Sequence, residues 1–184
     1  MSLQSRAVTM TKQMIQIEST DPGTYENAMA DWITTQLAPY PNVRLSRQEV
    51  LPGRPNLIAE LTGDPSLPAL VMICHMDTVV VGDGWTLPPF DAIEKDGKIY
   101  GRGACDMKSG LACCLSAFQY AAETLQTSGK TPKQTLKLIC SMDEEDFMRG
   151  SEACIQAGWV TDHDWVIDAE PTNGQIQMAH KGRT

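Results

Sequence analysis

Residues 69–78 read Ala-Leu-Val-Met-Ile-Cys-His-Met-Asp-Thr, six apolar residues followed by a histidine and an aspartate two positions apart. A short apolar run bounded by turn residues is typical of a strand that is buried on both faces. Polar side chains that directly follow such a strand lie at its carboxyl end, which is where open α/β sheets bind their ligands. The segment therefore predicts a buried strand that carries His75 and Asp77 into a binding site.

Two more apolar runs, 135–141 and 165–167, are also followed by acidic residues. We expect both to be buried strands, with a further strand at 56–61, a loop or short hairpin over 82–98, and the start of another strand at 176–179. The spacing of apolar residues predicts helices over 5–17, 25–37, 109–125 and 151–156. Strands that alternate with helices indicate an α/β fold with a mostly parallel sheet.

The composition narrows the class of protein. The chain has 184 residues, 42% of them hydrophobic, and a net charge of -8, which argues against a nucleic-acid partner or an anionic membrane surface. No apolar stretch approaches the roughly 20 residues of a membrane span, and the polar start has no apolar signal region. Six cysteines without a C-x-x-C pair predict a reducing cytoplasm and no disulfide framework.

His75, Asp77 and Asp106 are residue types that bind or orient metal ions. An imidazole can bind a metal through one nitrogen while a carboxylate two residues later holds the other nitrogen and fixes the tautomer. Asp106 follows a glycine-rich segment, 101–103, and a carboxylate in such a place can bridge two cations. Each has a structural alternative: a hydrogen-bonded histidine at a strand end, and an aspartate that stabilises a helix N-terminus.

The acids that follow the other two predicted strands also indicate a metal site. Asp143, Glu144 and Glu145 repel one another unless cations neutralise them. One acid of such a pair can bind a metal while the other takes a proton from metal-bound water. The alternatives are a solvated acidic loop here and an exposed turn at Glu170-Pro171. Together, several carboxylates with one imidazole suit Zn²⁺, Co²⁺ or Mn²⁺.

These segments resemble the M20 metallopeptidase and deacylase family, which includes acetylornithine deacetylase, succinyl-diaminopimelate desuccinylase, aminoacylase and glutamate carboxypeptidase. The matching segments, in order, are 74–79, 85–89, 100–110, 143–145 and 169–172. The resemblance implies a three-layer, zinc-peptidase-like α/β fold with helices on both faces of the sheet. It implies that residues 1–179 are the N-terminal part of the catalytic domain and that 180–184 begin a lid domain, otherwise missing, through which the full-length protein forms a homodimer.

The resemblance also implies a role for each site residue. Two divalent metal ions, Zn²⁺ foremost, would be bound: His75 and Glu170 on one, Glu145 on the other, and Asp106 bridging both. Asp77 would orient His75, and a cis peptide would follow Asp106. The implied reaction is hydrolysis of an amide bond in an N-acyl amino acid or small peptide. A water held between the metals would lose its proton to Glu144, the general base.

In one respect the chain departs from the family pattern. The family's last metal-binding histidine follows the lid, and neither His163 nor His180 matches a ligand position. We therefore expect a truncated catalytic domain whose 184 residues are inactive alone. A non-catalytic metal-binding fragment and an acidic interaction domain without metal are the alternatives. Whether the enzyme is a deacylase or a dipeptidase or carboxypeptidase stays open.

Overall fold

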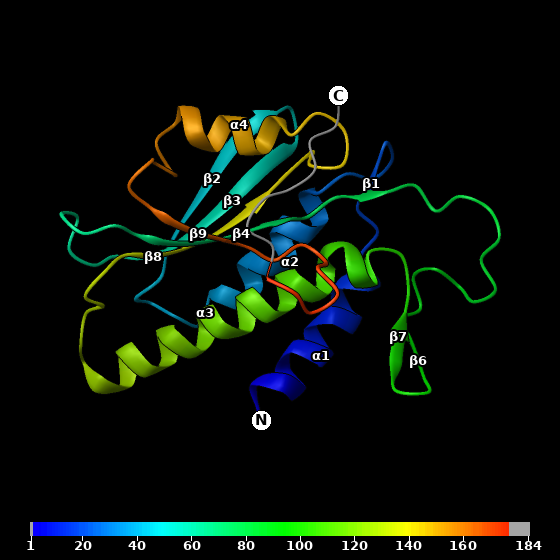
Figure 1. Cartoon of the computed structure of the whole chain (residues 1–184), viewed down its shortest axis with the longest axis horizontal. Coiled ribbons are helices and arrows are strands. Elements are labelled where there is room, and N and C mark those ends of the chain that lie inside the picture. The colour runs from blue at the N-terminus through cyan, green and yellow to red at the C-terminus, as the bar shows by residue number, and fades with distance from the viewer. Residues whose placement is uncertain (1, 177–184) are drawn as a thin grey trace.

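The computed structural model describes residues 2–176, which form a mixed α/β fold around a five-stranded sheet (Figure 1). The strand order is β2-β3-β8-β4-β9. These strands are β2 (Arg44–Leu51), β3 (Arg54–Leu61), β4 (Leu70–His75), β8 (Leu136–Ser141) and β9 (Trp165–Asp168). β4 is parallel to both of its neighbours, β8 and β9, so the carboxyl ends of these three strands meet at one edge of the sheet.

Helices cover both faces of this sheet. They are α1 (Leu3–Ile15), α2 (Asn27–Leu37), α3 (Ser109–Ser128) and α4 (Arg149–Gln156). The first three lie on one face and α4 on the other (Figure 1). In β3, Leu57 and Leu61 pack into the larger core with α1, α2 and α3, whereas Ile58 packs into the smaller core with Cys154 of α4. This alternation is the period of two expected of a strand buried on both faces, and the predicted three-layer α/β arrangement is confirmed.

The remaining elements are short. They are β1 (Thr20–Asp21), which pairs with β5 (Thr78–Val79), the hairpin of β6 (Ile93–Lys95) and β7 (Lys98–Tyr100), and a turn at Ala104–Lys108 that leads into α3 and has non-helical backbone angles at Asp106 and Met107. Asp96 and Gly97, the two residues between β6 and β7, both have positive φ, as a tight hairpin turn requires. The short hairpin foreseen within 82–98 is therefore present, although it extends to Tyr100.

The helices and strands predicted before residue 176 are confirmed with ends shifted by two or three residues at most, but two predictions need correction. The sequence pattern does not predict β2, a half-exposed edge strand that joins β3 in an antiparallel hairpin. Since β3 also runs antiparallel to β8, the sheet is mixed rather than mostly parallel. β9 is apolar but not buried, because it is the other edge strand, and Trp165 is 69% exposed. Residues 177–179 of the last expected strand lie outside the described residues.

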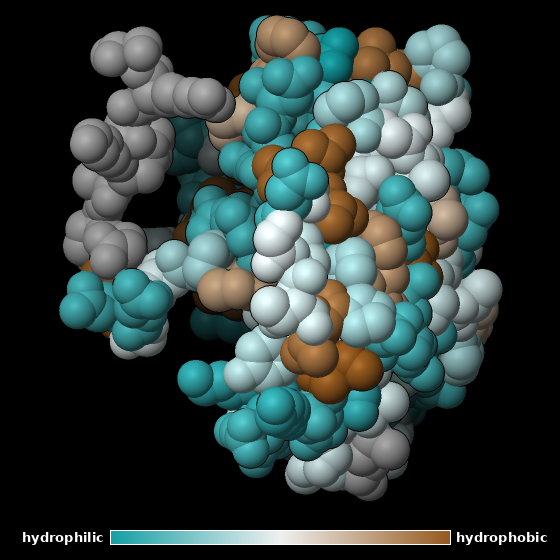
Figure 2. All heavy atoms as spheres, turned by 90° about the vertical axis from the view of Figure 1, so that its right-hand side faces the viewer, coloured by the Kyte–Doolittle hydropathy of each residue, from teal (hydrophilic) through white to brown (hydrophobic). Residues whose placement is uncertain are grey.

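In the part of the chain that the structure describes, no helix combines the length and the apolar character needed to cross a bilayer. On the face shown in Figure 2, apolar side chains gather in several small groups among polar ones.

All six cysteines are free thiols; Cys105 and Cys113 are exposed and the other four are buried.

A buried cluster of charges ties β3 to the loops behind the sheet edge. Arg54 donates through Nε to Glu26 Oε2 at 2.9 Å, and its Nη2 donates to Glu26 and to Asp21. The same guanidinium lies 3.4 Å from Asp143 Oδ1 and 4.2 Å from the ring centroid of Tyr25. Glu26 and Asp143 are both fully buried, so Arg54 is the counter-charge that lets these carboxylates leave water.

We expect Arg54→Met to lower the free energy of unfolding by about 3–5 kcal/mol, because it leaves the buried Glu26 carboxylate without its cation. Urea unfolding followed by circular dichroism measures this. The matched control is Arg44→Met on the neighbouring strand, whose side chain is 66% exposed and lies 3.9 Å from Glu60. An exposed pair of this kind is worth about 0–1 kcal/mol. Equal, small losses in the two variants would contradict the assigned role of Arg54.

Candidate metal centre

The six residues singled out in the sequence lie together at one edge of the sheet. His75 is the last residue of β4, Glu144 and Glu145 follow β8, and Glu170 follows β9. Because β8, β4 and β9 are parallel neighbours, the residues that follow or end these strands lie close together. Asp106 reaches the same place from the turn that precedes α3.

His75 is the centre of this group. Its Nε2 lies 3.2 Å from Asp106 Oδ1, 3.5 Å from Glu170 Oε1 and 3.7 Å from Glu144 Oε2. Donor atoms of His75, Asp106 and Glu145 lie within 4.8 Å of one another, and so do those of His75, Glu144 and Glu170. The imidazole is buried, whereas the Asp106 side chain is 53% exposed and those of Glu144 and Glu170 about a third exposed. The site thus has a buried base and an open, acidic mouth.

Asp77 holds the site through both its backbone and its side chain. His75 Nδ1 lies 2.9 Å from the Asp77 carbonyl oxygen and 3.6 Å from its carboxylate. A carbonyl oxygen only accepts, so Nδ1 carries a proton, which leaves Nε2 as the ring nitrogen that can bind a metal. The tautomer is therefore fixed by the carbonyl, where the sequence pattern suggests the carboxylate.

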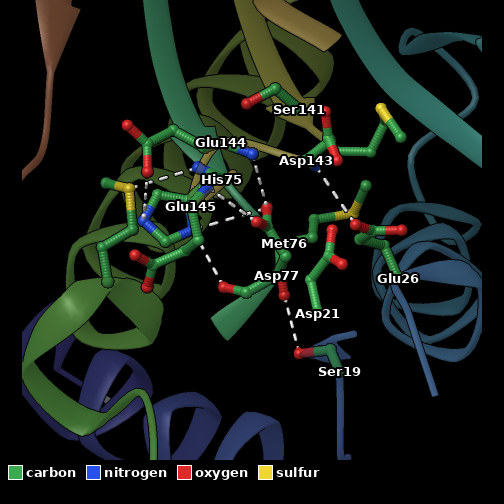
Figure 3. Close-up of polar contacts among 12 residues, drawn as sticks. Ser19, Asp21, Glu26, His75, Met76, Asp77, Ser141, Asp143, Glu144 and Glu145 are labelled. Atoms are coloured by element: carbon green, nitrogen blue, oxygen red, sulfur yellow. Dashed lines mark hydrogen bonds and ion pairs between the residues drawn. The ribbon is translucent and has the colours of Figure 1, made fainter. Parts of the chain in front are cut away.

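The Asp77 carboxylate instead holds the loop after β8. Its Oδ1 accepts the backbone N–H of Glu144 at 3.1 Å, and its Oδ2 accepts that of Glu145 at 2.9 Å. Figure 3 shows His75, Asp77, Glu144 and Glu145 gathered in this way. One buried residue thus fixes the orientation of the imidazole and the position of both glutamates.

Asp106 is presented by the turn that begins at Gly103. Gly103 begins the turn with φ of 76°, and a Cβ there would lie 2.6 Å from Thr78 Cγ2, so the position demands glycine. The peptide bond between Asp106 and Met107 is cis, as the resemblance implies. Met107 is fully buried, and its sulfur accepts the backbone N–H of His75 at 3.1 Å. The turn that carries Asp106 is therefore attached to the strand that carries His75.

Burial and mutual repulsion raise the pKa of three of the acids, whereas the hydrogen bond to His75 lowers the pKa of Asp106. Burial lowers the pKa of His75, but its hydrogen bond to Asp106 and the charges of Asp77, Glu170 and Glu144 outweigh burial and raise it to about 9. Burial, with repulsion from Asp106, raises the pKa of Glu170 to about 8. Burial also raises the pKa of Glu144 and of Glu145. Repulsion between carboxylates that favours bound protons equally favours a bound divalent cation.

The donor atoms fit divalent cations of the zinc type. Both groups of donors around His75 consist of one imidazole nitrogen and carboxylate oxygens, without a thiolate. This combination suits Zn²⁺, Co²⁺ and Mn²⁺. The geometry therefore supports a metal centre at this edge.

Sequence reasoning missed the residues behind the centre. Asp143 donates its backbone N–H to Glu26 Oε1 at 3.1 Å, and its two carboxylate oxygens accept from Arg149 at 2.6 Å each. Arginines rather than metal ions therefore neutralise the first acid of the Asp143-Glu144-Glu145 run. No local pattern indicates this, because Glu26 and Arg54 lie far from residue 143 in sequence.

Of the two other histidines, His163 is an exposed loop residue, 3.8 Å from Asp162 Oδ1 and outside the group around His75. His180 lies outside the described residues.

Comparison with known proteins adds a family to this geometry. The model of peptidase family M20/M25/M40 matches residues 71–181. A probable succinyl-diaminopimelate desuccinylase of Staphylococcus aureus is 40% identical over 131 residues, which are 70% of this chain and 31% of that protein. The chain thus spans about a third of the length of the curated relatives it matches.

Solved structures agree on the fold. An M20 family metallo-carboxypeptidase of Sulfolobus solfataricus has a TM-score of 0.69 and 21% identity, covering 89% of this chain and 37% of that one. A dinuclear metal-binding M20 peptidase of Bacillus subtilis has a TM-score of 0.60 and 17% identity, covering 90% of this chain and 42% of that one. At such identities the likeness speaks for the fold alone.

We expect Asp77→Asn to weaken Zn²⁺ binding by about 10–100-fold, the usual cost of losing a residue that orients metal ligands. The new amide group turns an N–H toward one of the two backbone N–H groups of Glu144 and Glu145, while the carbonyl of residue 77 still holds His75. Competition with a chromogenic chelator measures the affinity. Asp162→Asn, in an exposed loop, is the control. Unchanged affinity in Asp77→Asn would show that the carboxylate does not organise the centre.

Proposed function

The chain belongs to peptidase family M20/M25/M40, and we propose that it forms the N-terminal part of the catalytic domain of a two-metal hydrolase that cleaves an amide bond. The observation that carries this proposal is the meeting of His75 Nε2 with three carboxylates within 3.7 Å. We assign residues 1–179 to that domain and 180–184 to the start of a lid domain. The homodimer and the cytoplasmic location stay predictions.

We propose that His75 and Glu170 hold one cation, that Glu145 holds the other, and that Asp106 lies between them. In support, Asp106 Oδ1 is 3.2 Å from His75 Nε2, and the ligand atoms of His75, Asp106 and Glu145 lie within 4.8 Å of one another. Zn²⁺ is the expected metal, with Co²⁺ or Mn²⁺ as alternatives. When bound, such cations supply Lewis acidity to the substrate carbonyl and to the attacking water.

Glu144 is the proposed general base. Its carboxylate lies beside the ligand group, with Oε2 3.7 Å from His75 Nε2, and its backbone is anchored to Asp77. It is a third exposed, so an attacking water can reach it. Glu144 would accept the proton of this water as the oxygen attacks the carbonyl carbon. It would then deliver that proton to the amine nitrogen as the C–N bond breaks.

For the substrate, we favour an N-acyl amino acid over a small peptide. The relative at 40% identity is named a probable succinyl-diaminopimelate desuccinylase, whereas the solved structures named as peptidases are more distant in sequence. A dipeptidase or carboxypeptidase would use the same chemistry. Comparing N-acetyl amino acids, N-succinyl amino acids and dipeptides as substrates of the full-length protein separates these activities.

We expect Glu144→Gln in the full-length protein to keep its metal content but lose about 10²–10⁴-fold in kcat, the usual contribution of a general base. The amide has nearly the shape of the carboxylate but accepts no proton. Metal analysis and initial rates measure the two properties. Glu152→Gln, exposed on α4, is the control and should match the wild-type protein. Undiminished turnover by metal-loaded Glu144→Gln would remove Glu144 from the mechanism.

We further expect the 184-residue chain to bind metal yet hydrolyse none of these substrates. Among residues 2–176, the centre contains a single imidazole, and the chain matches only 31% of its curated relative. Rates of the 184-residue chain and of the full-length protein, each measured with added Zn²⁺, check this. Turnover by the short chain would contradict the expectation. Absence of bound metal would favour the alternative of an acidic interaction domain.

A further inference from the structure

Lys108 is a fully buried lysine two residues after Asp106, at the junction of the turn and α3. Its Nζ donates to the carbonyl oxygens of Met14 at 3.1 Å and of Ile17 at 2.8 Å. Both carbonyls belong to the C-terminal end of α1 and the residues just after it, where helix carbonyls carry partial negative charge. The Met14 carbonyl also accepts the backbone N–H of Ile17 at 3.0 Å. Lys108 therefore joins the turn of Asp106 to the end of α1.

The surroundings of Lys108 are shaped for this contact. A Cβ on Gly103 would lie 3.1 Å from Lys108 Cδ, so the glycine leaves room for the lysine stem. The backbone N–H of Lys108 donates to the Gly103 carbonyl at 2.9 Å, which closes the turn. A lysine used only to fill the core would be a poor choice, because burying its amine costs free energy unless hydrogen bonds compensate.

The turn is thus held at two buried residues that directly follow Asp106. Met107 attaches it to His75 in β4, and Lys108 attaches it to α1. Asp106 itself has an exposed side chain, which contacts His75 and lies beside Glu170 and Glu145, all members of the same centre. The position of its carboxylate therefore depends on how firmly the backbone beneath it is held.

We propose that Lys108 is a positioning residue that fixes the backbone of residues 104–108 against α1 and so sets where the Asp106 carboxylate meets a cation. This rests on the proposed function in one respect, that Asp106 is a metal ligand. Lys108 touches neither substrate nor metal. Its contribution is to limit the movement of a ligand that lies between two other elements.

The test is Lys108→Met in the 184-residue chain, which keeps the length of the stem and removes the donor. We expect binding of Zn²⁺ and Co²⁺ to weaken about 10–100-fold, as for other residues that hold metal ligands in place. We also expect the visible absorption of bound Co²⁺ to change, because it reports ligand geometry. Circular dichroism checks that the variant is folded. If Lys108→Met does not fold, Lys108→Gln serves, since its amide keeps N–H donors but the shorter side chain holds them back from the Met14 and Ile17 carbonyls.

Leu61→Ala is the matched control for a merely structural role. Leu61 is fully buried at the far end of β3, and its truncation should cost about 2–5 kcal/mol of stability without touching the turn. We expect folded Leu61→Ala to bind Co²⁺ with wild-type affinity and spectrum. Equal weakening in Leu61→Ala and Lys108→Met would overturn the proposal, as would wild-type binding and spectrum in the Lys108 variant. A wild-type chain that binds neither metal would instead overturn the proposed function on which this inference rests.

Discussion

The carboxylate of Asp77 is the group on which the rest of the site depends. It is fully buried, and burial raises its pKa against the lowering effects of His75 and of the backbone N–H groups of Glu145 and Glu144. A buried carboxylate is tolerated only where such donors surround it. Two of its donors are the backbone N–H groups of Glu144 and Glu145. The hydrogen bonds that stabilise the Asp77 charge therefore also position these two glutamates in the site.

Asp77 in turn depends on a second layer of charges. The Glu26 carboxylate accepts hydrogen bonds from Arg54 and from the backbone N–H of Asp143, and the Asp143 carboxylate accepts from Arg149. As a result, the backbone N–H groups of residues 143, 144 and 145 all donate to buried carboxylates, from Glu26 and Asp77. The loop after β8 is therefore held residue by residue, which is what a site that must place ligands within a fraction of an ångström requires.

The sequence predicts well what depends on local patterns, and poorly what depends on distant partners. The strand at 69–74 and the edge where His75, Glu144 and Glu170 meet follow from apolar runs and from the geometry of parallel strands. β2 escapes prediction because an edge strand with one solvated face need not look apolar. β9 is predicted to be buried because its residues are apolar. The apolar pattern does not show that the strand lies at the edge of the sheet, where its side chains are exposed.

Within the site, side-chain types are readable from sequence but their partners are not. The pairing of Arg54 with Glu26 spans 28 residues, and the contact of Asp143 N–H with Glu26 spans 117. The part played by the Asp77 carbonyl is also hidden, since every residue has a carbonyl group and only the fold decides which one faces an imidazole.

The acids at and behind the metal centre fall into two classes by what neutralises them. Asp21, Glu26 and Asp143 are paired with arginines, and Asp77 with backbone N–H groups. Among residues 2–176, no lysine or arginine forms an ion pair with the working acids, which are Asp106, Glu144, Glu145 and Glu170. They share one imidazole and stay partly open to solvent. Half-buried carboxylates without a lysine or arginine partner repel one another. The fold gives arginines to some acids and none to these four, so bound cations would relieve their repulsion.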